Sequence, residues 1–596
     1  MIQPQTEPSP DRCSTQHAML IVWGHFARTI GLRERLSSVP IRQKTVTHAP
    51  QDNLLELLIG LLSGMEYLTD LSVGPTPLVK DPAVATAWHL DTLADASTVS
   101  RTLKACDAAT VASLRVALDE VRQPFLDQAI MDLRARQQRL VLDADLTGRP
   151  VSSTSHTYPD AAFGYMDGEL RLGYQLAEIC VQTSRFGRQW LSARHHPGSM
   201  VSAPCLLELI QDAERGLKCH PRRRTELVEQ RLAACEAALT EQERLVGQQD
   251  RCVSLQTQRL ARLETQIQEA QTRVRWLRVV PASRRQSGPF SQLSRIEAQL
   301  DGWQRQQERA QAQITHAQAV ALRHRARAQA LEVERARLQA YLGQLRQENA
   351  TQLNPPRCTI RLDAGFSSGE NLTALIELGY DVETKSGNAA LVQALRKQVT
   401  ETRLWTRVGK NAEMIGWPNY RIHSCPYPLT VALERFHTPA GLLHAVLIRS
   451  QDGPEATCPE LTEWFHAYNA RQTIEAGNKE EKTTFKVQHL MSRSRAGIEL
   501  QALLTVFAAH VVRWATTWVQ PRIEQSSLRF EAVLASPKHM VRIAANSPAV
   551  VDRSEERVRV CFSPLSSLDG VVVCVAGMPG LQLVLPLFES HHFSRA

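Results

Sequence analysis

The sequence lacks the patterns that mark secreted, membrane-spanning or zinc-binding proteins. Its first residues, MIQPQTEPSPDRC, show no basic stretch followed by an apolar one, so we see no signal peptide. The longest apolar stretch, Leu500 to Val519, is interrupted by His510 and Arg513 and predicts a buried helix, not a membrane span. The twelve cysteines form no CxxC pair, which argues against structural zinc and favours single buried thiols in a reduced, cytoplasmic protein.

Lysine is absent from one long stretch that carries the whole excess of positive charge. From Arg222 to Ala350 the sequence has 22 arginines, no lysine and 14 acidic residues, a net charge of +8 that equals that of the entire chain. Exposed arginine attracts a phosphate backbone, so this stretch is a candidate nucleic-acid contact. A solvated helical surface without a ligand explains the same composition.

The chain is long enough to form several domains. Its 596 residues exceed what one hydrophobic core supports, so two to four domains are expected. A content of 43% hydrophobic and 22% charged residues excludes a wholly disordered chain. We divide the chain into an N-terminal helical domain with a candidate DNA-end-binding role (1–135), a first half-core (136–220), a helical hairpin (221–352), a second half-core with a β-rich insertion at about 400–455 (353–520), and a C-terminal region (521–596).

One segment of the N-terminal domain is typical of the start of a DNA-recognition helix. We expect a helix over Asp95–Lys104 with Ser97 as its N-cap. The side chains that could reach DNA are Thr98, Ser100, Arg101 and Lys104. An ordinary capped helix gives the same pattern.

The arginine-rich stretch contains two long seven-residue repeats. Apolar residues recur every seven positions from Leu232 to Val274, and the same period runs from Ile296 to Leu345. A proline- and glycine-containing segment, Pro281–Pro289, separates the two runs. Sustained heptads on both sides of such a break predict an antiparallel coiled-coil hairpin with arms of roughly 75 Å. The hairpin could hold DNA or pair with a second subunit, and we favour DNA because the excess charge is entirely arginine.

Two aspartates lie near the predicted ends of apolar strands. Asp145 follows Leu140–Ala144, and Asp363 follows Cys358–Leu362. A carboxylate in such a position costs stability unless it meets a cation or hydrogen-bond donors. Two such acids together with an acid on a helix could hold hard divalent ions through oxygen ligands. Asp143 is an alternative to Asp145, because a strand's period of two places both on one face.

The third acid lies on a predicted helix, Glu460–Lys482. At about 100° per residue, four of its side chains fall within an arc of about 60°. They are Tyr468, Arg471, Glu475 and Lys482. This face suits a site for metal and phosphate, with Glu475 as a metal ligand, Arg471 and Lys482 on DNA phosphates and Tyr468 hydrogen-bonding nearby. A surface helix with an Arg471–Glu475 ion pair is the alternative.

These four residues carry a family resemblance. Their spacing, Tyr-x2-Arg-x3-Glu-x6-Lys, resembles at every position the YREK signature of DDE insertion-sequence transposases of the cut-and-paste branch. Asp145-Leu146-Thr147 resembles the first-aspartate strand of that family, in which Ser or Thr follows two residues after Asp, and this favours Asp145 over Asp143. The block around Asp363, with Lys385 downstream, is similar to the second-aspartate block. The resemblance covers about 40% of the chain, at about 140–200 and 355–520.

The resemblance implies a fold, a reaction and partners. The fold would be α/β, a ribonuclease-H-like mixed sheet interrupted by the hairpin. Asp145, Asp363 and Glu475 would be the catalytic and metal-binding residues, holding two Mg²⁺ ions or Mn²⁺ in their place. The chain would cleave the terminal inverted repeats of its element and join them to target DNA, as a homodimer on double-stranded DNA. We expect a cytoplasmic, nucleoid-associated protein without a membrane partner.

Two other functions remain open from the residues. The first is a ribonuclease-H-like nuclease that cuts DNA but does not join it. The second is a catalytically inactive DNA-bridging protein that uses the coiled coil. The presence of all three acids argues against a decayed site, and detection of joined products would separate a transposase from a nuclease.

Overall fold

The chain folds into two compact units. The computed structural model describes residues 11–43, 47–281, 291–400, 404–422, 424–439, 441–450, 460–554 and 557–576. One unit combines the parts of the chain on either side of the long hairpin, 1–222 and 354–596, and the other is the hairpin itself, Arg223–Leu353. The described cysteines form no disulfide with one another, and most of them are buried.

The N-terminal part of the larger unit is mostly helical, as the sequence predicted. After a short strand, β1 (Asp11–Thr15), it contains α1 (Ala18–Thr29), α2 (Leu32–Ser37), α3 (Pro50–Leu62), α4 (Pro82–Ala87), α5 (Ala96–Ala105) and α6 (Ala108–Ala135). The apolar faces of these helices enter one extensive core that also includes residues from the late helix α14 (Arg495–Val519) and the C-terminal region. Residues distant in sequence therefore build this core together.

The expected cap of α5 is wrong by two residues. The helix begins at Ala96, and Asp95 caps it by accepting a hydrogen bond from the Thr98 backbone N–H at 2.8 Å. An aspartate is as good an N-cap as a serine, and Asp95, two residues before Ser97, takes the role because it directly precedes the first helical residue. Arg101 and Lys104 are exposed on this helix.

Glu56 on α3 makes the stability of the helical region depend on pH. The side chain is 2% exposed, both oxygens accept from the Ala94 N–H at 2.9 Å, and burial raises the pKa of Glu56 from 4.5 to about 7. A raised carboxyl pKa favours the protonated folded state, so the contribution of Glu56 to stability falls as pH rises from 4.5 to 7 and stays low above it.

We therefore expect Glu56→Gln to stabilise the protein relative to wild type at pH 8 but not at pH 4.5. The difference in free energy of unfolding between the two proteins should grow by roughly 3 kcal/mol at most across this range. Urea unfolding of both proteins at the two pH values measures it. Glu34→Gln on α2 changes the same charge at an exposed position and is the matched control. A difference for Glu56→Gln that is the same at both pH values would contradict the prediction.

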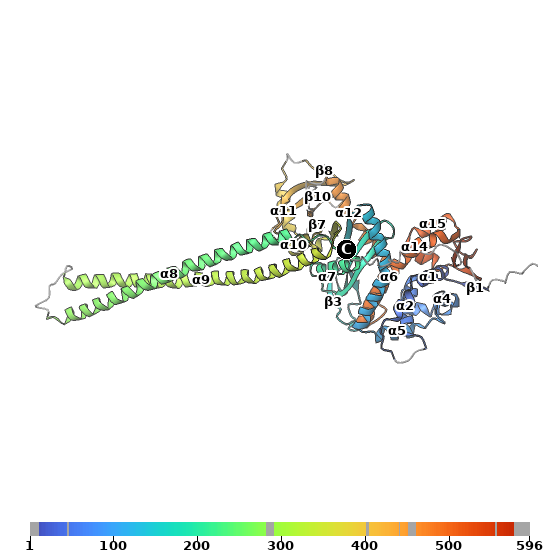
Figure 1. The fold of residues 1–596 in the computed structure, drawn as a ribbon, viewed down its shortest axis with the longest axis horizontal. Helices are drawn as coiled ribbons and strands as arrows, with labels where there is room; N and C mark the ends of the chain where they lie inside the picture. The colour runs from blue at the N-terminus through green and yellow to red at the C-terminus, as the bar shows by residue number, and fades with distance from the viewer. Residues whose placement is uncertain are drawn as a thin grey trace, which may run out of the picture. The chain divides into compact units, whose positions relative to one another are not determined.

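A ten-stranded mixed sheet forms the middle of the larger unit (Figure 1). Its strands are β2 (Leu140–Pro150), β3 (Ala162–Met166), β4 (Glu169–Thr183), β5 (Gly187–Pro197), β6 (Cys358–Leu362), β7 (Asp381–Lys385), β8 (Thr406–Arg407), β9 (Ala412–Tyr420), β10 (Leu429–Thr438) and β11 (Gly441–Ser450). The order is β3-β4-β2-β6-β7-β11-β10-β9-β8, and β5 also pairs with β4. Strands β2, β6 and β7 are parallel neighbours, whereas β4 and β5 are antiparallel additions on one side and β11 is antiparallel to β7 on the other.

Helices pack on this sheet or connect its strands. They are α7 (Ser202–Leu217), α10 (Gly369–Glu377), α11 (Ala389–Gln398), α12 (Leu461–Asn469), α13 (Gln472–Thr483) and α14. Strand β3 and the length of β2 were not predicted, while the predicted strands before Asp145 and Asp363 are present in β2 and β6, and the predicted β-rich region contains β8 to β11. The expectation of one helix over Glu460–Lys482 is wrong, because the chain turns at Ala470 and Arg471 between α12 and α13.

The hydrophobic stretch near residue 500 forms α14, the most buried long helix of the sheet unit. Every residue from Leu500 to Ala509 is buried, including Gln501 and Thr505. By length and composition the helical stretch Arg495–Arg522 could cross a membrane, but 83% of its most apolar window is buried inside the protein. Its apolar residues are used in packing against α3, α6 and β5.

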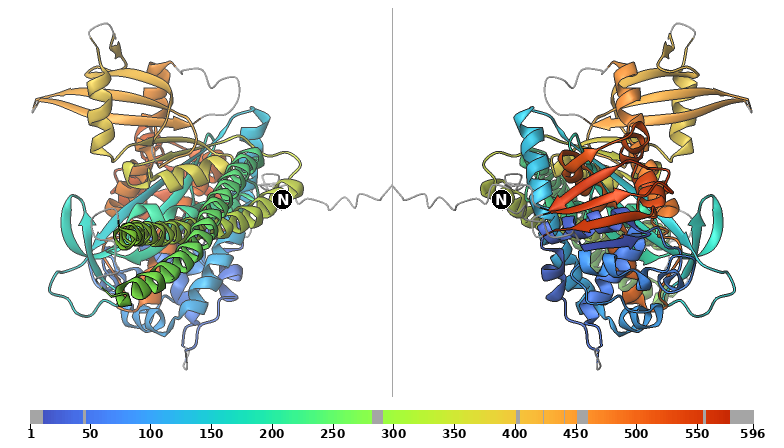
Figure 2. Two further views of the ribbon diagram at one scale, coloured as in Figure 1. Left: turned by 90° about the vertical axis from the view of Figure 1, so that its left-hand side faces the viewer. Right: turned by 90° about the vertical axis from the view of Figure 1, so that its right-hand side faces the viewer.

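The C-terminal region forms a second, five-stranded antiparallel sheet. Its order is β1-β13-β14-β15-β12, with strands β12 (Ile523–Gln525), β13 (Ala549–Arg553), β14 (Val558–Phe562) and β15 (Val572–Ala576). Between β12 and β13 lie α15 (Leu528–Leu534), α16 (Pro537–His539) and a short π-helical turn. Figure 2 shows the red C-terminal strands beside the blue N-terminal helices, and β1 joins the two ends of the chain by pairing with β13.

The smaller unit consists of two long helices, α8 (Thr225–Val279) and α9 (Gln292–Thr351). Ion pairs join Glu229 to Arg346 and Arg278 to Glu297, so the helices run side by side in opposite directions. The predicted seven-residue runs account for half of the buried residues of the two helices, namely Leu239, Ile267, Val274, Ala310, Ala317, Leu338 and Leu345. The other half lie three or four residues away from these runs, and Leu232, Val246, Val253 and Leu260 of the first run are only half-buried. The most buried are Val228, Cys235, Leu239, Leu263, Ile267, Ala270, Val274, Ala310, Ile314, Ala317, Ala321, Leu338, Leu342 and Leu345. The predicted turn lies, from residue 282 on, outside the described residues.

Candidate active site

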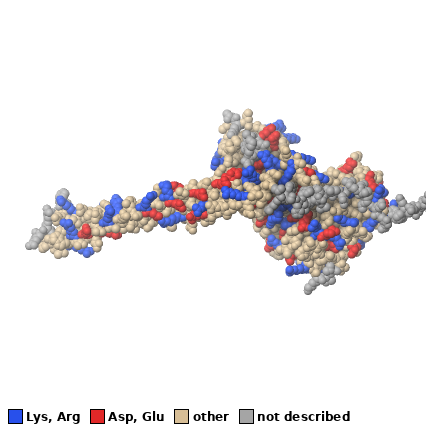
Figure 3. All heavy atoms as spheres, in the orientation of Figure 1, with Lys and Arg blue, Asp and Glu red and all other residues tan. Residues whose placement is uncertain are grey.

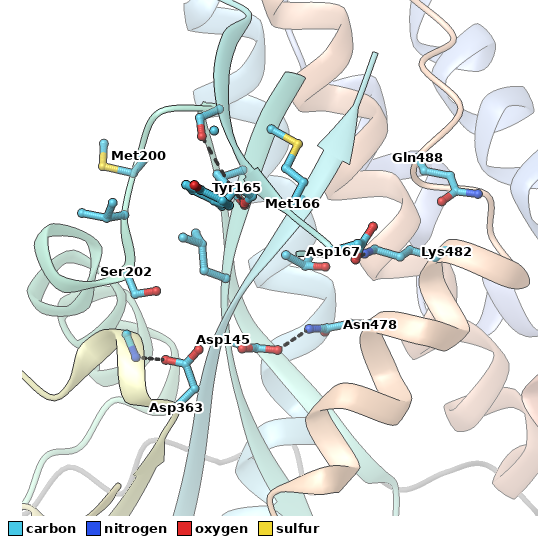
Figure 4. Close-up of a pocket in the computed structure, with 18 of the residues that line it drawn as sticks. Asp145, Tyr165, Met166, Asp167, Met200, Ser202, Asp363, Asn478, Lys482 and Gln488 are labelled. Atoms are coloured by element: carbon cyan, nitrogen blue, oxygen red, sulfur yellow. Dashed lines mark hydrogen bonds and ion pairs between the residues drawn. The ribbon is translucent and has the colours of Figure 1, made fainter. Parts of the chain in front are cut away.

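Two of the three predicted acids lie side by side at one point of the sheet. The parallel register pairs Asp143 with Arg361, and two residues further along the two strands come Asp145 and Asp363. Strand β6 ends at Leu362, and Asp363 caps the following turn by accepting from the Gly365 N–H at 2.9 Å. We expected Asp145 near the end of its strand, and this is wrong: it lies in the middle of β2, just past the last residue that pairs with β6. Figure 4 shows the two carboxylates as neighbours.

The third acid reaches the same place from the start of α13. Arg471 lies in the turn before this helix, and its guanidinium donates to Asp145 at 2.9 Å and to Glu475 at 2.8 Å. The Arg471 side chain is 7% exposed, that of Asp145 14% and that of Glu475 58%. The ion pair that we considered for Arg471 and Glu475 thus exists, but the same guanidinium also pairs with the largely buried Asp145.

These residues line a large open cavity of about 1070 Å³. One wall is α13, another is the segment before α7, and a third is the β3–β4 hairpin. Asp145, Asp363, Arg471, Glu475, Asn478 and Lys482 contribute the charged and polar lining. Phe163, Tyr165 and Leu170 on the hairpin are more than half exposed at its edge, which gives the cavity an apolar rim opposite the acids.

The cavity concentrates negative charge around Asp145. Burial raises the pKa of Asp145 to about 6; Arg471 opposes this rise, and the nearby Asp363 and Glu475 add to it. Carboxylate oxygens are the ligands that hard divalent cations prefer, so the donor chemistry fits Mg²⁺ or Mn²⁺. Among the described residues no three acidic, histidine or cysteine side chains converge closely enough to hold an ion as they stand. Arg471 is the cation that bridges Asp145 and Glu475.

The alternative first acid, Asp143, has a different environment. Its side chain is fully buried, and both oxygens accept from the Arg361 guanidinium at 2.6 and 2.7 Å. A further Arg361 nitrogen donates to the carbonyl oxygen of Ala467 on α12 at 2.8 Å. Asp143 is absent from the cavity lining and has its acceptor capacity occupied by Arg361. The pair ties β2 and β6 to the helix that precedes Arg471.

Tyr468 and Lys482, the other two residues of the predicted face, separate in the structure. Tyr468 is 5% exposed on α12, and its hydroxyl donates to the carbonyl oxygen of Leu362 at 3.1 Å. It therefore supports the strand that carries Asp363 and is not part of the cavity lining. Lys482 does line the cavity, and its ammonium lies 3.4 Å from Asp167 on the β3–β4 hairpin. The expectation of a single face failed because it assumed an unbroken helix.

Asn478 is a further residue of the site, and it was not predicted from the sequence. Its amide donates to the second oxygen of Asp145 at 2.7 Å from the middle of α13 (Figure 4). Asn478 lies three residues after Glu475, so a helical period starting from Glu475 would have placed it on an adjoining face. Arg471 and Asn478 together fix both oxygens of Asp145.

Ionisable groups are also buried behind Asp145. Glu178 lies opposite Asp145 in the β2–β4 register and is fully buried, as is Glu481 on α13. Burial raises the pKa of each carboxyl, and Glu481 raises that of Glu178 further. Arg149 lies in the same layer and donates to the carbonyl oxygen of Val487 at 2.9 Å. These groups connect α13 and the chain after it to the sheet.

A comparison with protein families finds one match. Residues 14–160 match the family described as Transposase DDE domain group 1. The matched stretch spans 147 of the 596 residues and includes Asp145, but neither Asp363 nor Glu475. The match supports a transposase of the DDE type, an enzyme that acts on DNA. No curated protein matches the chain.

Proposed function

We propose that this chain is a cut-and-paste DNA transposase in which Asp145, Asp363 and Glu475 form the catalytic triad. The observation that carries the proposal is their convergence on one cavity from three separate parts of the chain. The match over residues 14–160 supports the class of enzyme independently of that geometry. The exact Tyr-x2-Arg-x3-Glu-x6-Lys spacing favours the branch with the YREK signature.

The catalytic core would be ribonuclease-H-like. In favour of this fold, the strands β5-β4-β2-β6-β7 form a mixed sheet in which β2, β6 and β7 are parallel. Asp145 lies on β2, and Asp363 directly follows β6. The hairpin interrupts this core after α7, and β8 to β11 extend its sheet as the β-rich insertion. We propose that α8 and α9 are an antiparallel coiled coil, which their regular seam of buried residues favours.

The chain's own residues would bind and orient the DNA end. Asp145, Asp363 and Glu475 would hold two Mg²⁺ ions, which supply Lewis acidity and activation of the attacking oxygen when bound. Asn478 would keep the Asp145 carboxylate turned into the cavity. Arg471 would release Glu475 and pair with a DNA phosphate, because a guanidinium binds phosphate as well as carboxylate.

The reaction would require two copies of the chain. Both ends of an element must be cut and joined together, so we propose a homodimer on double-stranded DNA that binds the terminal repeats and the target. The protein would act in the cytoplasm on the nucleoid. The N-terminal helices, with Arg101 and Lys104 exposed on α5, are the region that we propose contacts the element ends.

A test of the function uses the DNA that flanks the gene. Short inverted repeats on both sides would provide the substrate, as a labelled duplex carrying one repeat and its flank. With Mg²⁺ or Mn²⁺ and a target plasmid, we expect cleavage at the repeat end and joined products. Cleavage without joining would replace the proposal with a nuclease, and binding without cleavage would replace it with an inactive bridging protein.

Lys482 provides a test of phosphate contact in the cavity. Its side chain is 20% exposed, and among the described residues it pairs with the exposed Asp167 at 3.4 Å, a weak contact that a phosphate could replace. We expect Lys482→Gln to weaken DNA binding similarly across sequences and to lower the slope of log K against log salt by about 0.9. Titrations between 50 and 200 mM salt measure the slope.

Lys397→Gln is the matched control for this measurement. Lys397 is an exposed lysine on α11, outside the cavity, and its loss should leave the slope unchanged. Arg471→Gln is a less clean test, because Arg471 also neutralises Asp145 and Glu475. An equal slope for Lys482→Gln and the wild type would remove Lys482 from the proposed phosphate contacts.

A further inference from the structure

The hairpin unit has an uneven distribution of charge along its length. The Asp250–Arg325 ion pair, at 2.7 Å, marks a plane across both helices. Beyond this plane, residues 250–281 and 291–325 contain 11 arginines and 6 acidic residues, a net charge of +5. On the other side, residues 223–249 and 326–353 contain 8 arginines and 8 acidic residues, a net charge of zero. We call these the distal half and the proximal half.

The arginines of the two halves are also used differently. In the proximal half, five of the eight form ion pairs: Arg223 with Glu348, Arg231 and Arg337 with Glu334, Arg244 with Glu241, and Arg346 with Glu229. In the distal half all eleven are exposed, and only Arg278 and Arg325 are ion-paired within the described residues. The nine others are Arg251, Arg259, Arg262, Arg273, Arg275, Arg295, Arg305, Arg309 and Arg323. Figure 3 shows blue atoms on the distal half with few red ones beside them.

This arrangement is not what folding of the hairpin requires. An arginine that stabilises two packed helices meets a carboxylate on the partner helix, as Arg346 meets Glu229. Nine exposed guanidiniums without carboxylates repel one another, so they cost stability unless an anion binds them. The distal half therefore carries a surface that is suited to a polyanion.

The spacing of these arginines fits an extended, regular anion. Arg295, Arg309 and Arg323 are fourteen residues apart, two heptads, and so return to one face of α9. The separation is about 21 Å along the helix, and the whole distal half is about 45 Å long. A DNA duplex presents a phosphate every 3.4 Å or so on each strand, so roughly 13 base pairs would lie along this half.

We propose that the distal half of the hairpin binds the phosphate backbone of double-stranded DNA without reading its sequence. This contact is separate from the cavity, and the choice of DNA over other polyanions rests on the proposed function. A second copy of the hairpin is a poor occupant, because two distal halves of charge +5 would repel each other. The proximal half, with no net charge and mostly paired arginines, does not share the role.

The test compares two sets of four substitutions in the full-length chain. The distal set changes Arg262, Arg295, Arg305 and Arg309 to Gln, and the proximal set changes Arg244, Arg327, Arg337 and Arg346 to Gln. Both remove four exposed positive charges. Binding to a 40-base-pair duplex of arbitrary sequence is titrated between 50 and 200 mM salt, without divalent ions so that no chemistry occurs.

We expect the distal set to lower the salt slope by roughly three to four units and the proximal set by less than about one. The same four distal positions changed to Lys keep the charge and should restore the slope, and far-UV circular dichroism confirms that the helices remain in each variant. Equal changes for the two sets would overturn the proposal, because they would reflect overall charge alone.

Three further outcomes would also overturn it. In the first, the distal set would lose binding to phosphatidylserine vesicles but not to DNA. In the second, it would lose binding to structured RNA but not to DNA. In the third, it would change only the mass of the protein in solution, measured by light scattering. The proposed function fails separately. If the wild type neither cuts nor joins DNA but the slopes differ as expected, the transposase proposal falls and the DNA contact stands. If DNA is cut and joined but the slopes agree, only the distal contact falls.

Discussion

Asp145→Asn, Asp363→Asn and Glu475→Gln should each abolish cleavage of the element end while leaving DNA binding nearly intact. Each change keeps the shape of the side chain and removes the charge that a divalent ion requires. We expect cleavage to fall by roughly 10³-fold or more, as it does when a group that acts on the transition state is removed. Because most phosphate contacts lie elsewhere, the affinity for DNA should change by less than about tenfold.

Asp167→Asn is the matched control for the triad. Asp167 lines the same cavity with a side chain that is 57% exposed, and its positive φ of 53° is one that asparagine tolerates. The variant removes one carboxylate from the cavity and should cleave at nearly the wild-type rate. Gel assays of a labelled duplex in Mg²⁺, with binding measured in parallel, give both quantities. Wild-type cleavage by any of the three triad variants would remove that residue from the site.

Regular patterns made much of the fold predictable. The heptads predicted both helices of the hairpin, because regularly spaced apolar residues in a long, charged helix indicate packing against a second helix. The strands around Asp145 and Asp363 were visible because runs such as Leu140–Ala144 are buried on both faces and contain few polar residues. The late helix was predicted as buried because His510 interrupts an apolar stretch, and in the structure it accepts from the Trp190 N–H at 2.8 Å.

Other features depend on contacts between distant segments and so left no local signal. The turn at Arg471 is one, because helical periodicity continues through it in the sequence. The contact made at this turn is the hydrogen bond from Arg471 to Asp145, 326 residues away, which no local pattern indicates. Tyr468 is another, because a phenol on a polar helix gives no sign that its hydroxyl will meet Leu362. The C-terminal sheet was not predicted, since its first strand, β1, comes from the other end of the chain.

The largest loss of stability should follow from Arg361→Ala. The Asp143 side chain is entirely buried, and Arg361 is the hydrogen-bond partner of both its oxygens. Loss of the guanidinium therefore leaves the Asp143 carboxylate buried without these partners. Removing one partner of a buried ion pair leaves an uncompensated charge and typically costs about 3–5 kcal/mol. Urea unfolding followed by tryptophan fluorescence should show the loss, since eight of the ten tryptophans lie in the larger unit. Arg171→Ala, which breaks the exposed pair with Glu169, should cost no more than about 1 kcal/mol.

The double variant Asp143→Leu/Arg361→Met separates a structural Asp143 from a catalytic one. Replacing both partners of a buried pair by apolar residues of similar volume is often nearly neutral, so most of the lost stability should return. The Ala467 carbonyl loses a donor, which should leave a deficit of about 1 kcal/mol. If Asp143 serves only to hold β2, β6 and α12 together, the refolded double variant should cleave DNA at nearly the wild-type rate. A stable double variant without cleavage would instead make Asp143 the first acid of the triad and would displace Asp145.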